Sequence, residues 1–200
     1  KEALYSFCQY GSVLGGHPDM RLIPGTEVSS GSLGHGLSIG LGMAIAGSAD
    51  KSRYRVYVLL GDGECQEGSV WEAVMAAPHF KADNLVAIVD NNGLQVLDRV
   101  DNTISGLQPL ADKFRTFGWE VKEIDGHDIK QIFDVLSGVP FKKGKPSCVI
   151  AHTVKGKGVS FMEDRLNWHY KSLNADERQR ALEEIENSAA TEKSTRHIRL

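Results

Sequence analysis

The segment YRVYVLLGDGECQEGSVWEAVMAAPHFKADNLVAIVDNNG, residues 54–93, decides the fold of this chain. Residues 54–60 and 84–90 are apolar runs rich in β-branched side chains, and each run stops at a turn signal, GDG or NNG. Such runs predict strands, and the apolar residues at helical spacing in 67–80 predict a helix between them. A strand, a helix and a second strand in this order indicate a βαβ unit with parallel strands.

The same alternation of strands and helices continues on both sides of this unit. The sequence predicts further helices over 31–49, 109–118, 127–138 and 174–187, and further strands over 119–125 and 146–153. The runs YVLL, LVAIV and CVIA are apolar on both faces, which indicates strands covered by helices on both sides. We therefore expect an α/β fold, a parallel sheet with helices on both faces. Ligands of such folds bind beyond the carboxyl ends of the strands.

The length of 200 residues suits one medium-sized domain with a substantial core. We expect residues 1–190 to form this single domain and residues 191–200 to form a polar, frayed tail. The chain begins at Lys1 without a signal-peptide pattern. We expect the natural protein to extend upstream, so that the domain is incomplete at its N-terminus.

Charge and composition argue against several classes of protein. The chain has 23 Lys and Arg residues against 26 Asp and Glu residues, a net charge of −3. It has no basic excess to neutralise phosphates, so we expect no nucleic acid partner and no membrane attachment. The longest mostly apolar stretch, 37–47, has 11 residues, whereas a membrane span needs about 20. Cys8, Cys65 and Cys148 are widely spaced and form no C-x-x-C pair, which favours a cytoplasmic protein without disulfides or structural zinc.

Asp62 and Asn92 follow the two strands of the central unit, 30 residues apart. If these strands are neighbours, both side chains emerge at the same edge of the sheet. One carboxylate, one amide oxygen and a nearby carbonyl form a hard oxygen site that suits Mg²⁺, which completes its shell with phosphate oxygens and water. Gly63 would let a phosphate approach the backbone closely, and 13 of the 21 glycines lie between residues 11 and 68. Asp-Gly and Asn-Gly are also common turn dipeptides, which is the structural alternative.

GDG followed about 30 residues later by NN resembles the thiamine diphosphate signature. The run GDGECQEGSVWEAVMAAPHFKADNLVAIVDNNGLQV resembles the diphosphate-binding domain of transketolases more closely. The match continues on both sides of this run, so that the resemblance covers roughly residues 10–175. The further matching segments, in the family order, are GGHPDM, PGTEVSSGSLGHGLSIGLGMAIA, DKFRTFGWEVKEIDGHD, AHTVKGKGVSFMED and NWHYK. The sequence stops where the pyrimidine-binding domain of a one-chain transketolase would follow, so we expect it to resemble the N-terminal subunit of a split, two-chain transketolase.

The resemblance implies a role for each matching residue. Asp62, Asn92 and the carbonyl of Leu94 would hold Mg²⁺, while Gly61, Gly63 and Asn92 would contact the diphosphate. The remaining cofactor contacts implied by the resemblance are Gly31, Leu33, Lys155 and His169. The catalytic residues it implies are His17 and His169, which would face the substrate hydroxyls, and Glu67, a buried acid at the subunit interface.

The resemblance also implies an activity and partners. A C-terminal subunit would supply the pyrimidine-binding domain, and the pair would transfer a two-carbon ketol unit from a ketose phosphate to an aldose phosphate, as in the pentose phosphate pathway. We expect a heterotetramer, and we expect the isolated chain to be inactive. Tyr170 stands where the family usually has glycine, so the sugar substrate could differ. Another thiamine diphosphate enzyme acting on a sugar-like substrate is therefore an alternative.

Other interpretations of these residues remain open. His17 and Lys155 could be loop residues, His169 a packed ring beside tryptophan, and Glu67 a first-turn acid that stabilises a helix dipole. We assign no function to His35, His127 or Cys65. Of these, His127 resembles a helix cap.

Two further enzyme classes lack their motifs, and one non-enzymatic class competes. GSLGHG follows no strand and does not read G-x-G-x-x-G, which argues against a nicotinamide dehydrogenase. No G-K pair is followed by Ser or Thr, which argues against a P-loop enzyme. A non-catalytic interaction subunit that retains a relic cofactor site is the stronger alternative.

Overall fold

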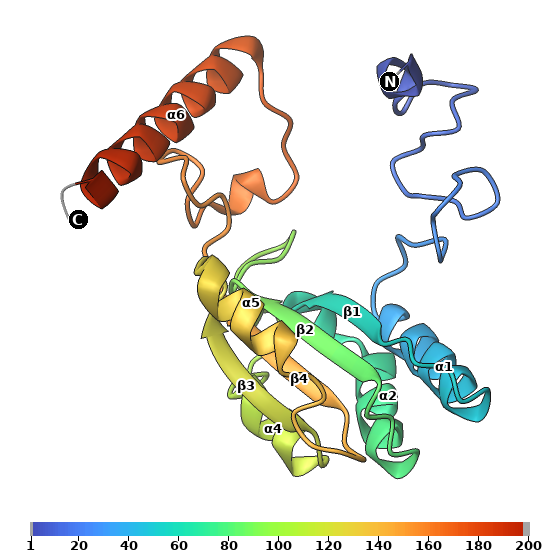
Figure 1. Cartoon of the computed structure of the whole chain (residues 1–200). Helices are drawn as coiled ribbons and strands as arrows, with labels where there is room; N and C mark the ends of the chain where they lie inside the picture. The colour runs from blue at the N-terminus through green and yellow to red at the C-terminus, as the bar shows by residue number, and fades with distance from the viewer. Residues whose placement is uncertain (1, 198–200) are drawn as a thin grey trace.

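The computed structural model describes the backbone of residues 2–197 and the side chains of residues 3–188. Its centre is a sheet of four parallel strands in the order β1-β2-β4-β3 (Figure 1). The strands are β1 (Val56–Gly61), β2 (Leu85–Asn91), β3 (Glu120–Asp125) and β4 (Ser147–His152). Each boundary lies within two residues of the one predicted from the sequence. The predicted α/β fold with a parallel sheet is confirmed.

Helices cover the two faces of this sheet unequally (Figure 1). Three helices pack on one face, namely α1 (Gly36–Ala49), α2 (Gly68–His79) and α4 (Leu110–Thr116), and α5 (Ile129–Ser137) lies on the other. The shorter or more distant helices are η1 (Glu2–Ser6), η2 (Gly63–Gln66), α3 (Val100–Thr103), η3 (Leu166–Trp168) and α6 (Ala175–His197), where η denotes a 3-10 helix.

The main core lies between the sheet and the layer of three helices. Phe114 of α4 is fully buried, and its ring centroid lies 5.8 Å from that of Trp71 and 5.4 Å from that of Trp119. Gly40 brings α1 close to β1, because a Cβ there would lie 2.4 Å from a methyl of Val58. Gly40 lies against Val58 of β1 and Leu85 of β2, so α1 packs on the two strands that the predicted site follows.

Two predicted helix boundaries are wrong. The helix expected over 31–49 begins only at Gly36, because Gly31 and Gly34 have φ angles of +123° and +83°, which a right-handed helix does not allow. The helix expected over 174–187 continues to His197, so most of the predicted frayed tail over 191–200 is helical. Residues 188–197 contain alanine, glutamate and lysine but no glycine or proline to end the helix. Residues 198–200 lie outside the described residues.

The prediction that helices cover both faces of the strand at YVLL fails for β1. The side chain of Leu59 is 71% exposed, and that of Tyr57 is also half exposed. The reason is that α5 packs beside β3 and does not reach the edge strand β1. Within the described part of the chain, no helix has the length and apolar character needed to cross a membrane.

Candidate cofactor site

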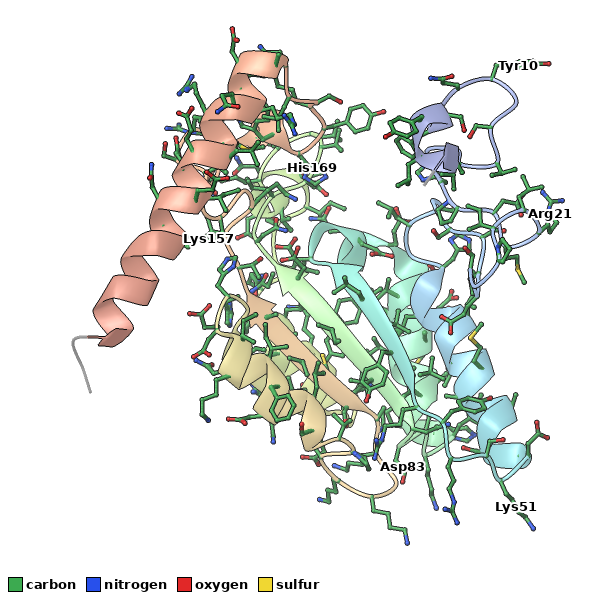
Figure 2. The ribbon with its side chains drawn as sticks, turned by 45° about the horizontal axis from the view of Figure 1, so that its top comes forward. Tyr10, Arg21, Lys51, Asp83, Lys157 and His169 are labelled. Atoms are coloured by element: carbon green, nitrogen blue, oxygen red, sulfur yellow. The ribbon has the colours of Figure 1, made fainter. Side chains whose placement is uncertain are left out.

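The strand register brings the ends of the strands to one edge of the sheet. Gly61 pairs with Asp90, and Asn91 pairs with His152, so β1, β2 and β4 end level with one another. The N-terminal segment and the segment leading into α6 both extend beyond this edge, on opposite sides (Figures 1 and 2). Figure 2 shows His169 on the same side of this edge as α6.

Asp62 lies directly after β1 and is almost completely buried, with 1% of its surface exposed. Its Oδ1 accepts a hydrogen bond from the Gly63 N–H at 2.8 Å, and its Oδ2 accepts one from the Gly93 N–H at 2.6 Å. The second bond reaches the turn after β2. Asp62 therefore joins the ends of the two strands, as the sequence predicts for neighbouring strands.

The carboxylate of Asp62 has no cationic partner among the side chains of residues 3–188. Burial raises its pKa above the usual value, the N–H groups of Gly93 and Gly63 act in the opposite direction, and the Asp90 carboxylate raises it further. Among the side chains that the structure describes, neither Asp62 nor Asp90 forms a salt bridge. A buried anion beside a second anion is costly unless a cation compensates it. The site therefore fits a bound metal ion.

The other proposed metal ligands belong to the same turn. Asn92 Oδ1 accepts from the Leu94 N–H at 2.9 Å, and its Nδ2 donates to Asp90 Oδ2 at 3.1 Å. The Thr153 hydroxyl donates to the other oxygen of Asp90. No group of three His, Cys, Asp or Glu side chains converges within the described residues. A metal here would thus rely on one carboxylate with amide and carbonyl oxygens, a hard donor set that suits Mg²⁺ better than zinc.

A cleft of about 470 Å³ opens over Asp62. Its lining includes nine of the eleven residues predicted from the sequence, namely Leu33, Gly61, Asp62, Gly63, Glu67, Asn92, Leu94, Lys155 and His169. They come from four separate parts of the chain, so the fold itself brings them together. A larger cleft of about 610 Å³ lies between α1 and the edge strand β1, but none of the predicted site residues lines it.

His17 and Gly31 are the two predicted residues outside this lining, and they lie against each other. A Cβ at Gly31 would lie 2.6 Å from Cγ of the His17 imidazole, so that only glycine leaves room for this ring. The His17 side chain is exposed. Two residues further along, Leu33 lines the cleft, so this pair lies next to the site.

His169 reaches the cleft from the segment between η3 and α6. Its Nδ1 is buried and has no hydrogen-bond partner among the described residues. Burial lowers the pKa of His169, and the positive charge of Lys155 lowers it further. The imidazole is therefore neutral at pH 7, with one ring nitrogen available to a ligand.

Glu67 is the N-cap residue of α2, and its side chain is exposed in this chain. The sequence predicts a buried acid at this position through the contact with a second subunit. Its side chain makes no capping hydrogen bond. Its N-cap position places the carboxylate at the positive end of α2, so the alternative interpretation as an acid that stabilises the helix dipole stays open.

Among the cleft residues that were not predicted from the sequence, Glu64 and Gln95 lie against the predicted glycines Gly61 and Gly63. Glu64 Oε1 accepts from the Gly34 N–H at 2.9 Å, and Oε2 accepts from the Gly61 N–H at 3.1 Å. Gln95 has a buried Nε2 without a partner among the described residues, and its side chain occupies the space where a Cβ of Gly63 would lie. The contacts of Glu64 with Gly34 and of Gln95 with Gly63 join segments far apart in sequence, so no local pattern indicates them.

The residues left without a function have structural surroundings. Burial, followed by the charges of Glu64 and Asp62, raises the pKa of the Cys65 thiol far above its usual value. His127 is not a helix cap: Asp128 caps α5, and His127 Nε2 instead accepts from the N–H of Val154 at 2.7 Å. The side chains of His35 and Tyr170 are exposed, and neither lines the cleft.

Comparison with known protein families agrees with this geometry. The sequence profile of the family described as "Transketolase, thiamine diphosphate binding domain" matches residues 1–189. The chain is 43% identical over 185 residues to an apulose-4-phosphate transketolase subunit of Phocaeicola vulgatus, covering 92% of this chain and 65% of that protein. It is 39% identical over 189 residues to the 6-deoxy-6-sulfo-D-fructose transketolase subunit SqwG of a Clostridium species, covering 94% of this chain and 68% of that protein.

Solved structures show the same fold. The transketolase of Campylobacter jejuni superposes with a TM-score of 0.85 at 30% identity, over 92% of this chain and 30% of that chain. The Pichia stipitis transketolase in complex with sedoheptulose 7-phosphate gives a TM-score of 0.81 at 26% identity, over 98% of this chain and 33% of that chain. This chain thus spans about two thirds of the two relatives and a third of the solved enzymes. The match over residues 1–189 shows that the chain belongs to the family of transketolase thiamine diphosphate-binding domains.

Proposed function

We propose that this chain is the N-terminal subunit of a two-chain transketolase that binds Mg²⁺ and thiamine diphosphate. With a C-terminal partner that supplies the pyrimidine-binding domain, it would transfer a two-carbon ketol unit from a ketose phosphate to an aldose phosphate. The observation that carries this proposal is the buried Asp62 carboxylate, which lines the cleft and pairs with no cationic side chain among the described residues.

The cofactor would be held by residues at the ends of β1 and β2. Asp62, Asn92 and the carbonyl of Leu94 would hold Mg²⁺, and the backbone of Gly61 and Gly63 would contact the diphosphate. When bound, thiamine diphosphate supplies the electron sink that carbon–carbon bond cleavage beside a carbonyl requires. The chain's own task is to fix the cofactor's anionic end and to keep water away from it.

Two histidines and a lysine would complete the site. Lys155 places a positive charge at the cleft, where it would attract the diphosphate. His169 is neutral at pH 7 because its pKa is lowered, so its buried Nδ1 could accept a hydrogen bond or a proton from a substrate hydroxyl. We assign the same role to His17, whose imidazole lies over Gly31 beside the cleft.

The partner and the substrate are inferred from relatives. Three relatives are named as transketolase subunits, which supports a partner for this chain, and we propose a heterotetramer in the cytoplasm. Glu67, exposed here, would be buried by the contact between the two chains. One related protein is named for a sugar phosphate and another for a sulfo sugar. Both sugars carry an anionic group, so we propose an anionic ketose as the donor.

Thermal unfolding of the native complex tests the cofactor site. At a ligand concentration 100 times Kd, binding stabilises by about 2.7 kcal/mol, which corresponds to a rise in Tm of roughly 5 to 10 °C for a chain of this size. We expect this rise with thiamine diphosphate and Mg²⁺, and its loss with EDTA or in Asp62→Ala. Asp50→Ala, which removes an exposed carboxylate at the end of α1, is the matched control and should keep the full rise.

The competing functions predict different results. A relic subunit would show no metal-dependent rise even in the assembled complex. Another thiamine diphosphate enzyme would show the rise but would not transfer ketol units between sugar phosphates. A screen of ketose and aldose pairs with the assembled complex separates this case. Tyr170→Gly would then test whether the residue after His169 affects the choice of sugar.

A further inference from the structure

One wall of the cleft is a loop without regular secondary structure. Residues 31–35, here called the glycine loop, lie between the N-terminal segment and α1. Gly31 and Gly34 both have positive φ angles. Leu33 lines the cleft, and Gly31 lies against His17. The position of this loop relative to Asp62 therefore determines the width of the cleft and the place of His17.

The backbone of Gly34 is held by hydrogen bonds at both its N–H and its carbonyl group. Its N–H donates to Glu64 Oε1 at 2.9 Å, and its carbonyl accepts from the Ser69 hydroxyl at 2.9 Å. The other oxygen of Glu64 accepts from the N–H of Gly61 at 3.1 Å, and Gly61 is the last residue of β1, directly before Asp62. A single carboxylate thus connects the glycine loop to the strand that positions Asp62.

A carboxylate is the side chain that this geometry requires. Both contacts to Glu64 come from backbone N–H donors, and an ionised carboxylate accepts at both oxygens. A glutamine of the same size could accept from one donor only and would point its own NH₂ at the other. Hydrogen bonds to a charged acceptor are also stronger than neutral ones.

We propose that Glu64 is a positioning residue that sets the glycine loop against the Asp62 end of β1 and so preforms the cofactor cleft. This inference rests on the proposed function, because its consequence is measured as affinity for Mg²⁺ and thiamine diphosphate. Glu64 needs no contact with the cofactor itself. Its effect reaches the cofactor through Leu33 on the loop and through Gly61 beside Asp62.

The test is Glu64→Gln in the full chain within its native assembly, with two readouts. Amide hydrogen exchange without cofactor should show faster exchange at Gly34 and Gly61, while the Gly93 N–H, which is bonded to Asp62, keeps its protection. Titration with thiamine diphosphate and Mg²⁺ should show an affinity lower on the order of 10- to 100-fold, as for other residues that orient ligand-binding groups.

Two matched variants separate the connection from general effects. Glu186→Gln removes the same charge from an exposed position on α6 and should change neither readout. Ser69→Ala removes the bond to the Gly34 carbonyl and should speed exchange at Gly34 but not at Gly61.

Each outcome decides the matter. Unchanged exchange at Gly34 and Gly61 in Glu64→Gln, or faster exchange with unchanged affinity, overturns the inference but leaves the proposed function intact. A wild-type complex that binds no cofactor overturns both. If Glu64→Gln fails to fold, the wild-type protein decides, since unprotected Gly34 and Gly61 amides would contradict the hydrogen bonds on which the inference stands.

Discussion

Two glycines of the VKGKG segment form a matched pair for testing the packing beside the cleft. Gly156 has φ +76°, and a Cβ there would lie 2.7 Å from the carbonyl oxygen of Met162. Gly158 has φ +93°, and a Cβ there would meet no atom within 4 Å. Both glycines have positive φ angles, but only at Gly156 would an added Cβ meet other atoms of the chain. The segment carries Lys155, whose carbonyl accepts from the N–H of Asp164 at 3.0 Å.

The expected cost of each alanine follows from this difference. A left-handed residue with a Cβ costs about 1 to 2 kcal/mol, and loss of glycine's freedom in the unfolded chain offsets about 0.4 to 1 kcal/mol of it. Gly158→Ala should therefore destabilise by roughly 0 to 1.5 kcal/mol. Gly156→Ala has the same two contributions to its free energy of unfolding. It must also displace the Met162 backbone, an overpacking cost of about 1 to 3 kcal/mol. The difference between the two variants isolates that last term.

Urea unfolding of both variants measures this difference directly. We expect Gly156→Ala to be less stable than Gly158→Ala by about 1 to 3 kcal/mol at an unchanged m-value. Because Gly156 adjoins Lys155, we also expect Gly156→Ala to weaken binding of thiamine diphosphate, and Gly158→Ala to leave it near the wild-type value. Equal free energies of unfolding in the two variants would refute the reasoning from the Met162 contact.

Three further predictions concern the core, the cysteines and His169. Phe114→Ala should lower the free energy of unfolding by about 3 to 5 kcal/mol in urea titrations, because the ring is fully buried; a loss below about 1 kcal/mol would contradict the described core. Thiol labelling in native buffer should modify the exposed Cys8 rapidly and reach Cys65 and Cys148 only on unfolding, because burial raises the pKa of both buried thiols. The lowered pKa of His169 means that the unfolded state binds the extra proton, so stability should fall as pH drops below about 6.5, the ordinary histidine value. His169→Gln should flatten this part of the pH profile, and an NMR titration midpoint of His169 at or above 6.5 would contradict the prediction.

The strands could be predicted well because their signals are local. Glycine and asparagine turns end the apolar runs of β1 and β2, and the regular register of parallel strands then brings Asp62 and Asn92 to one edge. The helix starts and ends were less accurate. Sequence alone did not show that Gly31 and Gly34 adopt left-handed backbones, and it suggested a tail where α6 continues. The exposed face of β1 also had no local signal, since it depends on where α5 packs.

The residues of the candidate site also fall into two groups, those with a local sequence signal and those without one. Residues that belong to a motif, such as Asp62 and Lys155, could be predicted from the residue types of the motif and their spacing. Residues that hold those motifs in place could not, because their partners lie about 30 residues away in sequence. Glu64 bonds to Gly34, and His127 bonds to Val154, across separate elements. Such contacts appear only once the chain is folded.

The concentration of glycine around the cleft has a different cause from the one that the sequence suggests. Close approach of a phosphate predicts open space where each Cβ would lie. At three of these positions the space is filled by the protein itself, since Gly31 faces His17, Gly34 faces Glu67 and Gly63 faces Gln95. At Gly61 the nearest atoms lie 3.9 Å from the Cβ position, which is ordinary contact distance. Most of these glycines are therefore required by the chain's own side chains, which they bring to the cleft, and room for a ligand at the backbone remains an argument for Gly61.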